Sequence, residues 1–112
     1  MTTEERAFLR TVAWMFMRHG RRDRAASVCA ALCEDDPRDG AAAAAFAEML
    51  LDAGETSKAL EILRGAYFPP ALDHAQAVLE TRALRMSGRK DEASRRWSRY
   101  LESRKGAERT WT

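Results

Sequence analysis

The residues that could carry out chemistry are few and widely separated in this chain. His19 and His74 are its only histidines, and neither has a cysteine or a second histidine at metal-ligand spacing in its own predicted helix. Cys29 and Cys33 are one helical turn apart, but no second pair of ligands accompanies them, whereas zinc needs three or four. We therefore expect no metal site and no cofactor.

The carboxylates cluster at Glu4 and Glu5 and at residues 34–36, and both clusters fall at predicted helix ends. Acidic side chains there ordinarily act as solvated caps. The sequence also lacks a glycine-rich phosphate loop and a nucleophile elbow. We therefore predict that the protein is not an enzyme.

Two basic clusters occur at 18–24, "RHGRRDR", and at 94–105, "SRRWSRYLESRK". The second interleaves aromatic residues with arginines, as some nucleic-acid surfaces do. Helical spacing instead predicts an apolar core face for that segment, with the arginines on a solvated face beside Glu92 and Glu102. That core face is Ala93, Trp97, Tyr100 and Leu101. We expect no nucleic-acid partner, and RNA binding through the arginines stays an alternative.

The composition favours a single helical domain. The chain has 112 residues, 46% hydrophobic and 32% charged, with a net charge of +2. Alanine is abundant, whereas isoleucine occurs once and valine three times, which favours helix over strand. No uncharged apolar run approaches the length that a membrane span needs, and the charged N-terminus does not resemble a secretory signal. We expect a cytoplasmic protein with Cys29 and Cys33 reduced.

Three glycines recur at an interval of 34 residues, and an alanine follows each of them five residues later: Gly20, Gly54 and Gly88, then Ala25, Ala59 and Ala93. A glycine of this kind ends a helix in the left-handed conformation. A fixed interval of this length predicts tandem helix pairs. The predicted units are residues 6–39, 40–73 and 74–105 of one domain, 1–105, and residues 106–112 form a C-terminal tail.

Local signals place the ends of these helices. Thr2 and Glu5 form a predicted capping box for the first helix, and Asp23 and Asp91 are candidate caps of later helices. The prolines at 69–70 end the second unit, because proline does not fit a helix interior. Small side chains are expected where the paired helices cross, at Ala13, Ala25, Ala47, Ala59 and Ala93.

These residues resemble the tetratricopeptide repeat family over almost the whole chain. The resemblance is carried by the three glycine–alanine pairs in phase and by Pro37 at the closing proline of the first repeat. It implies an all-α fold of three tandem helix-turn-helix hairpins in a short right-handed superhelix. Glu80 and Thr81 depart from the family's apolar pattern, so we expect a third unit that is looser or depends on a partner. An early aromatic is also replaced, by Leu9, Ala43 and Ala77.

The resemblance further implies a concave groove lined by the first helix of each unit. Transferred by position, its predicted lining is Ala7, Arg10, Trp14, Met17 and Arg18; Ala41, Ala44, Glu48, Leu51 and Asp52; and Ala75, Val78, Arg82, Arg85 and Met86. This lining predicts a continuous apolar trough suited to an amphipathic helix. The chain contains no asparagine, which disfavours the clamp for C-terminal carboxylates that some relatives in this family carry.

The C-terminal end of the array should expose apolar surface. Only seven residues follow residue 105, too few for a stable capping helix. We therefore expect a second interface at Trp97, Tyr100 and Leu101, with Trp111 folding back toward it. Such surface predicts that the chain works in a hetero-oligomer.

Length, unit number and the "PAL" segment before the third unit are similar to the small chaperones of bacterial type III secretion, and most similar to the needle-subunit co-chaperone. That resemblance implies a virulence-related role in protein transport, in which a needle subunit is held by an amphipathic helix together with a small helical co-chaperone. The alternatives are a chaperone of translocator proteins and a general tetratricopeptide scaffold.

Overall fold

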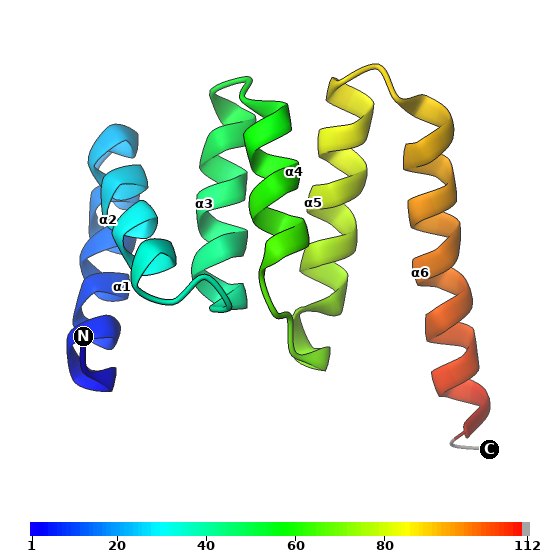
Figure 1. Ribbon diagram of the computed structural model, residues 1–112, viewed down its shortest axis with the longest axis horizontal. Coiled ribbons are helices and arrows are strands. Elements are labelled where there is room, and N and C mark those ends of the chain that lie inside the picture. The colour runs from blue at the N-terminus through cyan, green and yellow to red at the C-terminus, as the bar shows by residue number, and fades with distance from the viewer. Residues whose placement is uncertain (111–112) are drawn as a thin grey trace.

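The described part of the chain is all-helical, with six α-helices in three consecutive pairs (Figure 1). The computed structural model describes the backbone of residues 1–110 and the side chains of residues 1–107. Neighbouring helices run in opposite directions, and the pairs stand side by side in one row. The helices are α1 (Thr3–Arg18), α2 (Arg22–Asp35), α3 (Gly40–Asp52), α4 (Thr56–Gly65), α5 (Asp73–Met86) and α6 (Lys90–Thr110), with a short 3-10 turn, η1 (Pro70–Leu72), before α5.

The turn inside each pair is built in the same way three times. Gly20, Gly54 and Gly88 have φ values of 72°, 80° and 79°, in the left-handed region that glycine enters without a Cβ penalty. The residue after each glycine donates its N–H to the carbonyl five residues back, at 2.8, 2.8 and 2.9 Å. This pattern is the Schellman motif. The predicted role of the three glycines is confirmed.

The cap predictions were right for the first helix and wrong for two others. Thr2 accepts from the Glu5 N–H, and Glu5 accepts from the Thr2 N–H, which completes the predicted capping box. Asp23 and Asp91 instead lie within the first turns of α2 and α6. The Schellman turn starts each following helix two residues after its glycine, so an aspartate three residues after the glycine is already helical.

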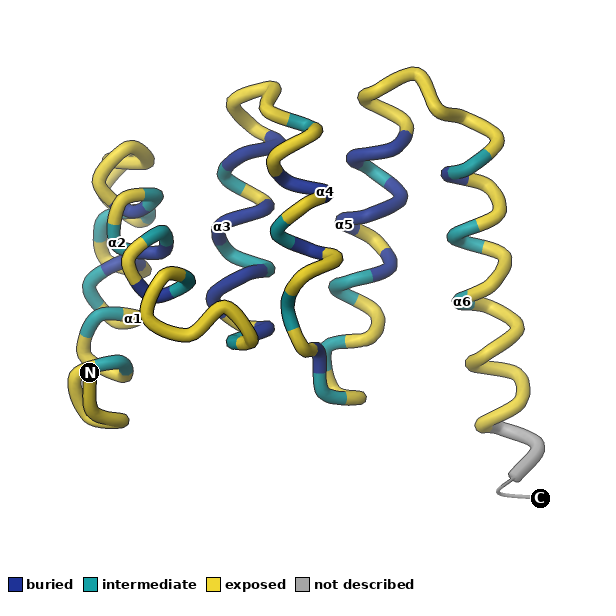
Figure 2. Tube along the Cα trace, viewed as in Figure 1, coloured by how far each residue is buried: buried dark blue, intermediate teal, exposed yellow. Residues whose placement is uncertain are grey.

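The core lies where the paired helices cross. The predicted alanines there are all buried, and Ala25, Ala47, Ala59 and Ala93 are fully so. Figure 2 shows that buried positions concentrate on α3, α4 and α5 and are sparse on α6. Small side chains let the helix backbones approach, and leucines fill the adjoining space: Leu32, Leu51, Leu63 and Leu84.

The third pair is not looser than the others, contrary to expectation. α5 packs along α6 as α1 packs along α2. Glu80 accepts a 2.6 Å contact from the guanidinium of Arg96, and both side chains lie between the two helices. Beside them, the rings of His74, Trp97 and Tyr100 contact one another. Polar and aromatic contacts thus close this pair.

The segment after α4 folds back over the start of α3. Tyr67 donates its backbone N–H to the Arg38 carbonyl at 3.2 Å, and Phe68 is buried. A Cβ at Gly40 would lie 2.3 Å from the Tyr67 carbonyl oxygen, so this close approach requires glycine. The prolines at 69–70 follow directly, and the predicted break is confirmed.

The last helix is longer than expected. α6 continues to Thr110, so residues 106–110 of the predicted tail are helical. Trp111 lies outside the described residues. None of the helices in the described part combines the length and apolar character that crossing a membrane requires.

Candidate functional site

The principal candidate site is a hollow between α1 and α3, called the α1–α3 hollow. Its volume is about 360 Å³, and its lining is almost entirely apolar. Trp14 stands at its edge with 59% of its surface exposed. Five of the predicted groove residues line it: Arg10, Trp14, Met17, Ala41 and Glu48.

The floor of this hollow is made of small and inert side chains. Ala41, Ala42 and Ala45 come from the alanine run of α3, and Cys29 and Leu32 of α2 lie beneath them. Burial raises the pKa of the Cys29 thiol. Burial, together with the neighbouring Cys29, raises the pKa of the Cys33 thiol to about 11. Both free cysteines therefore remain uncharged thiols and add no charge to the site.

Charged groups surround the hollow without entering it. The guanidinium of Arg18 lies 5.0 Å from the ring centre of Trp14, a cation–π contact that orients the indole. Arg10 lies 3.7 Å from the Asp39 carboxylate at the other end, and Glu48 lines the α3 side. Only the rim is thus polar, which suits a ligand with one apolar face.

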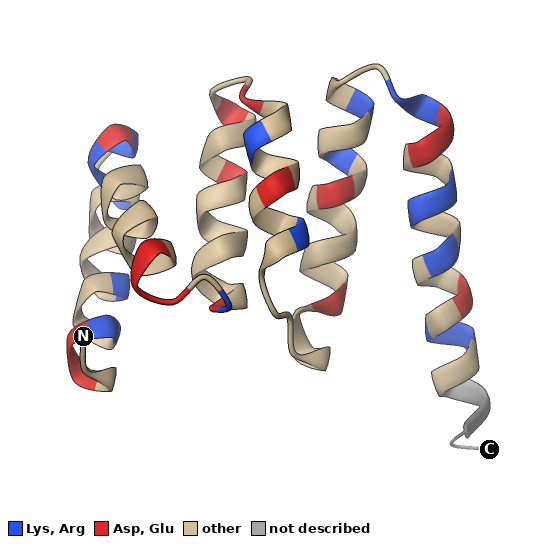
Figure 3. Ribbon diagram, in the orientation of Figure 1, with Lys and Arg blue, Asp and Glu red and all other residues tan. Residues whose placement is uncertain are grey.

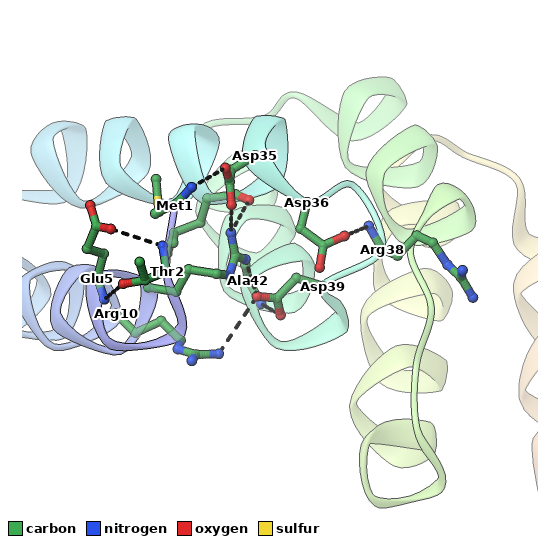
Figure 4. A network of polar contacts seen from close by, with 11 residues as sticks. Met1, Thr2, Glu5, Arg10, Asp35, Asp36, Arg38, Asp39 and Ala42 are labelled. Carbon is green, nitrogen blue, oxygen red and sulfur yellow. Dashed lines mark hydrogen bonds and ion pairs between the residues drawn. The ribbon is translucent and has the colours of Figure 1, made fainter.

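A polar network joins α1 to the end of α2 and the start of α3 (Figure 4). Arg6 donates to the Asp35 carboxylate at 2.6 Å, to the Leu32 carbonyl at 3.2 Å and to Asp39. Asp39 also accepts from the Ala42 N–H at 3.1 Å, as the N-cap of α3. This network sets the position of α1 against α3 and therefore the width of the hollow.

The same network controls the ionisation of its members. Burial acts to raise the pKa of Asp39, but the Ala42 N–H and the Arg6 guanidinium together hold that pKa below its ordinary value. The hydrogen bond to Asp39 in turn raises the pKa of Arg6. Sequence reasoning missed both residues, although an aspartate directly before the alanine run was an available N-cap signal.

The prediction that Leu51 lines the groove is wrong. Leu51 is only 1% exposed and belongs to the main core cluster. α3 and α5 pack directly against each other, so Leu51 of α3 is covered by a neighbouring helix. Met17, at the equivalent position of α1, lines the hollow instead. Ala44 and Ala75 are half-buried and line neither this hollow nor the one beside α6.

Ion pairs and close packing divide the predicted trough in two. Asp52 accepts from Arg22 at 2.7 Å and from Arg82 at 2.9 Å, which links α2, α3 and α5. Beyond this link lies a second hollow of about 440 Å³ between α5 and α6, called the α5–α6 hollow. This hollow is lined by four predicted groove residues, which are separate from the first site: Val78, Arg82, Arg85 and Met86.

The predicted second interface is partly covered. Trp97 and Tyr100 are half-buried by their mutual ring contact and by His74, whose Nδ1 lies 3.2 Å from the Tyr100 hydroxyl. Trp97 also lines the α5–α6 hollow. Leu101 remains 41% exposed. Of the three residues of the predicted second interface, Leu101 is thus the exposed one.

The arginines of α6 are mostly on the solvated face, as predicted, and Figure 3 shows their charges mixed with acidic ones. Arg96 is the exception, because its side chain is 13% exposed and pairs with Glu80. Arg64, Arg95 and Arg99 border a polar hollow of about 440 Å³ around that pair. The basic cluster thus has a structural member that helical spacing alone did not separate.

The described residues offer no further site with recognisable chemistry. Within the residues that the structure describes, no three His, Cys, Asp or Glu side chains are grouped as metal ligands. No family model and no curated protein matches the chain.

Proposed function

We propose that this chain is a non-catalytic, protein-binding chaperone of the tetratricopeptide type, and that its α1–α3 hollow holds an amphipathic helix of a partner protein. The repeat assignment is supported by the 34-residue interval and by three helix turns with the same glycine geometry. The proposal for binding depends chiefly on one observation, an exposed tryptophan beside an apolar hollow floored by alanines.

The chemistry of the hollow favours a helix with one apolar face. Small residues at Ala41 and Ala45 allow another backbone to come close, which large side chains would prevent. Trp14 and Met17 offer large contact areas, and methionine adapts to varied surfaces. Arg10 and Glu48 at the rim can contact the polar edges of such a helix. Affinity would come mainly from burial of apolar area.

The resemblance to small type III secretion chaperones suggests the partner. We propose the C-terminal amphipathic helix of a needle subunit, held in the cytoplasm with a second small helical co-chaperone. A subunit that polymerises through an apolar helix face is kept soluble when that same face is buried in the hollow. Release then requires competition for the helix.

The proposal is tested by titrating a synthetic peptide, the C-terminal segment of a needle subunit from the same host, into the full chain. Calorimetry measures the dissociation constant for the wild type and for Trp14→Ala. Loss of a central tryptophan contact is expected to cost about 2 kcal/mol, or roughly 30-fold in affinity. Phe8→Ala is the matched control, because Phe8 is equally exposed on α1 but does not line the hollow.

Three outcomes contradict parts of this proposal. Equal losses in Trp14→Ala and Phe8→Ala would mean that the hollow is not the binding site. An unchanged affinity in Trp14→Ala would exclude that residue as the main contact. A bound peptide that gains no helicity by circular dichroism would favour the translocator-chaperone alternative, in which the ligand is extended.

A further inference from the structure

The first helix carries apolar residues on a face with no neighbour among the described residues. Through the 34-residue interval, Phe8 and Met15 take the positions of Ala42 and Met49 in α3. Those two residues of α3 line the hollow toward α1 and α2. Phe8 is instead 67% exposed, and Met15 is also exposed. The side of α1 that would face a preceding helix pair is therefore apolar and open.

The other end of the row offers the surface that such a helix would need. Two intervals of 34 residues separate Thr81 from Ala13 and Trp97 from Cys29, so the members of each couple occupy equivalent positions. Ala13 and Cys29 line the α1–α3 hollow, where α3 packs along α2, whereas Thr81 and Trp97 line the α5–α6 hollow, beside which no further helix lies among the described residues. The C-terminal end thus repeats a surface that receives a helix elsewhere in the molecule.

A buried hydroxyl points to the same place. Thr81 is buried, and its Oγ1 has no hydrogen-bond partner within the part of the chain that the structure describes. A buried polar group without a partner is costly. Because Thr81 lines the α5–α6 hollow, a helix docked there could supply the missing partner or fill the space around it.

Helix lengths and charges also match between the two ends. When the helices are aligned by the 34-residue interval, α1 begins about one turn earlier than α3, at Thr3. In the same alignment α6 ends later than α2, at Thr110. Neighbouring helices run in opposite directions (Figure 1), so a helix docked on α6 would place its N-terminus beside the C-terminus of α6. That arrangement brings Glu4 and Glu5 toward Arg104 and Lys105, which have the opposite charge.

We propose that a second copy of this chain docks its α1 on the α5–α6 face of the first, so that the helix row continues from one molecule into the next. The contact is heterologous, because the two molecules contribute different faces. Phe8 and Met15 of one copy meet the α5–α6 hollow and Leu101 of the other. The α1–α3 hollow takes no part in this contact, so the inference is independent of the proposed function.

Sedimentation velocity over a range of micromolar concentrations tests the proposal on the full chain. The wild type is expected to associate, and the association should weaken as salt is added. Phe8→Asp disrupts the α1 face and Leu101→Asp disrupts the α5–α6 face. The self-association constant of each variant should be at least roughly 30-fold weaker than that of the wild type. Both residues are exposed, and circular dichroism verifies that each variant keeps its helicity. Met15→Asp provides an independent change of the α1 face.

The decisive measurement is an equimolar mixture of Phe8→Asp and Leu101→Asp. One intact face remains on each variant, and the two are complementary, so the mixture should form a heterodimer and nothing larger. Tyr67→Asp is the matched control, an exposed aromatic away from both faces, and should associate like the wild type. A monomeric wild type, a mixture that stays monomeric, or normal self-association of Phe8→Asp would each overturn the proposal.

Discussion

The second and third helix pairs share a backbone plan but fill its interior differently. In the second pair, Phe46 is buried in the core cluster and Ile62 is half-buried against that cluster. The residues 34 positions later are Glu80 and Arg96, whose ion pair is 7% and 13% exposed. Both pairs nevertheless have a glycine turn in the left-handed conformation and a fully buried alanine where their helices cross.

This difference shows which property of the interior the fold requires. A buried ion pair loses hydration that its mutual attraction only partly restores, so an apolar pair is often as stable or more stable. The helix pair forms in either case because glycine geometry and small crossing residues allow the backbones to approach. The interior contact therefore determines stability more than it determines the fold.

The starts of the two pairs differ in a related way. Asp39 caps α3 and pairs with Arg6, whereas Asp73, at the equivalent position, is the first residue of α5 and makes no capping hydrogen bond. Gly40 is required by the close approach of Tyr67, and its counterpart His74 contacts aromatic rings instead. The start of the second pair thus contacts the first pair, whereas the start of the third contacts aromatic residues of its own pair.

The largest expected effect is that of Glu80→Ala. The change leaves the Arg96 guanidinium largely buried without its carboxylate, and we expect a loss of about 3 kcal/mol in the free energy of unfolding. Urea denaturation followed by far-ultraviolet circular dichroism measures it. Glu92→Ala, which removes an exposed ion pair with Arg89, should change the stability little. Equal effects of the two changes would show that the Glu80 pair is solvated.

The double change Glu80→Leu with Arg96→Met makes the third pair resemble the second. Because it removes both charges and keeps the volume filled, the free energy of unfolding is expected to stay the same or rise by about 1–2 kcal/mol. The same denaturation experiment measures the change. A double variant as unstable as Glu80→Ala would mean that the ion pair is required for packing and is not exchangeable with an apolar pair.

Asp39→Ala should cost about 1–2 kcal/mol, because α3 loses its N-cap and Arg6 loses a partner. Asp73→Ala is the matched control and should cost less. The folded-state pKa of Asp39 is lowered, so its contribution is present above the ordinary aspartate pKa of about 3.9 and disappears as the pH falls through the lowered value. Wild type and Asp39→Ala should therefore become equally stable in acid, and a difference independent of pH would contradict this.

The smallest expected effect is a gain from Thr81→Ala. The change removes a buried hydroxyl without a partner in the described structure and restores the alanine found at this position in the first two pairs. We expect about 1 kcal/mol of added stability in thermal or urea unfolding. Thr11→Ala, at an exposed helix position, should change the stability little. A loss of stability in Thr81→Ala would indicate a hydrogen bond to water.

Sequence reasoning succeeded where the signal was local or periodic. The three glycine turns, the crossing alanines and the capping box at Thr2 are all present as predicted. Trp14 was correctly placed at an apolar hollow, because its position within the repeat determines its side of α1. The prediction that Asp23 and Asp91 cap their helices is wrong, because each helix begins before its aspartate, directly after the glycine turn.

Predictions failed where equivalent positions have different neighbours. Met17 and Leu51 occupy the same place in their helices, yet Met17 lines a hollow and Leu51 is buried. α1 stands apart from α3, while α3 packs on α5. Arg96 was assigned to the solvated face because helical spacing alone did not reveal Glu80 as its partner across the pair.

The sequence by itself therefore determined the helices of residues 1–110, their turns and the inward side of most of them. These features depend on glycine conformation, capping and apolar spacing, all of which act over a few residues. Only the tertiary structure decided that the trough is divided and that α1 stands apart from α3. Those outcomes depend on the spacing between helices. That spacing is set by side-chain volumes and by contacts such as that of Arg6 with Asp39, which join residues more than 30 positions apart.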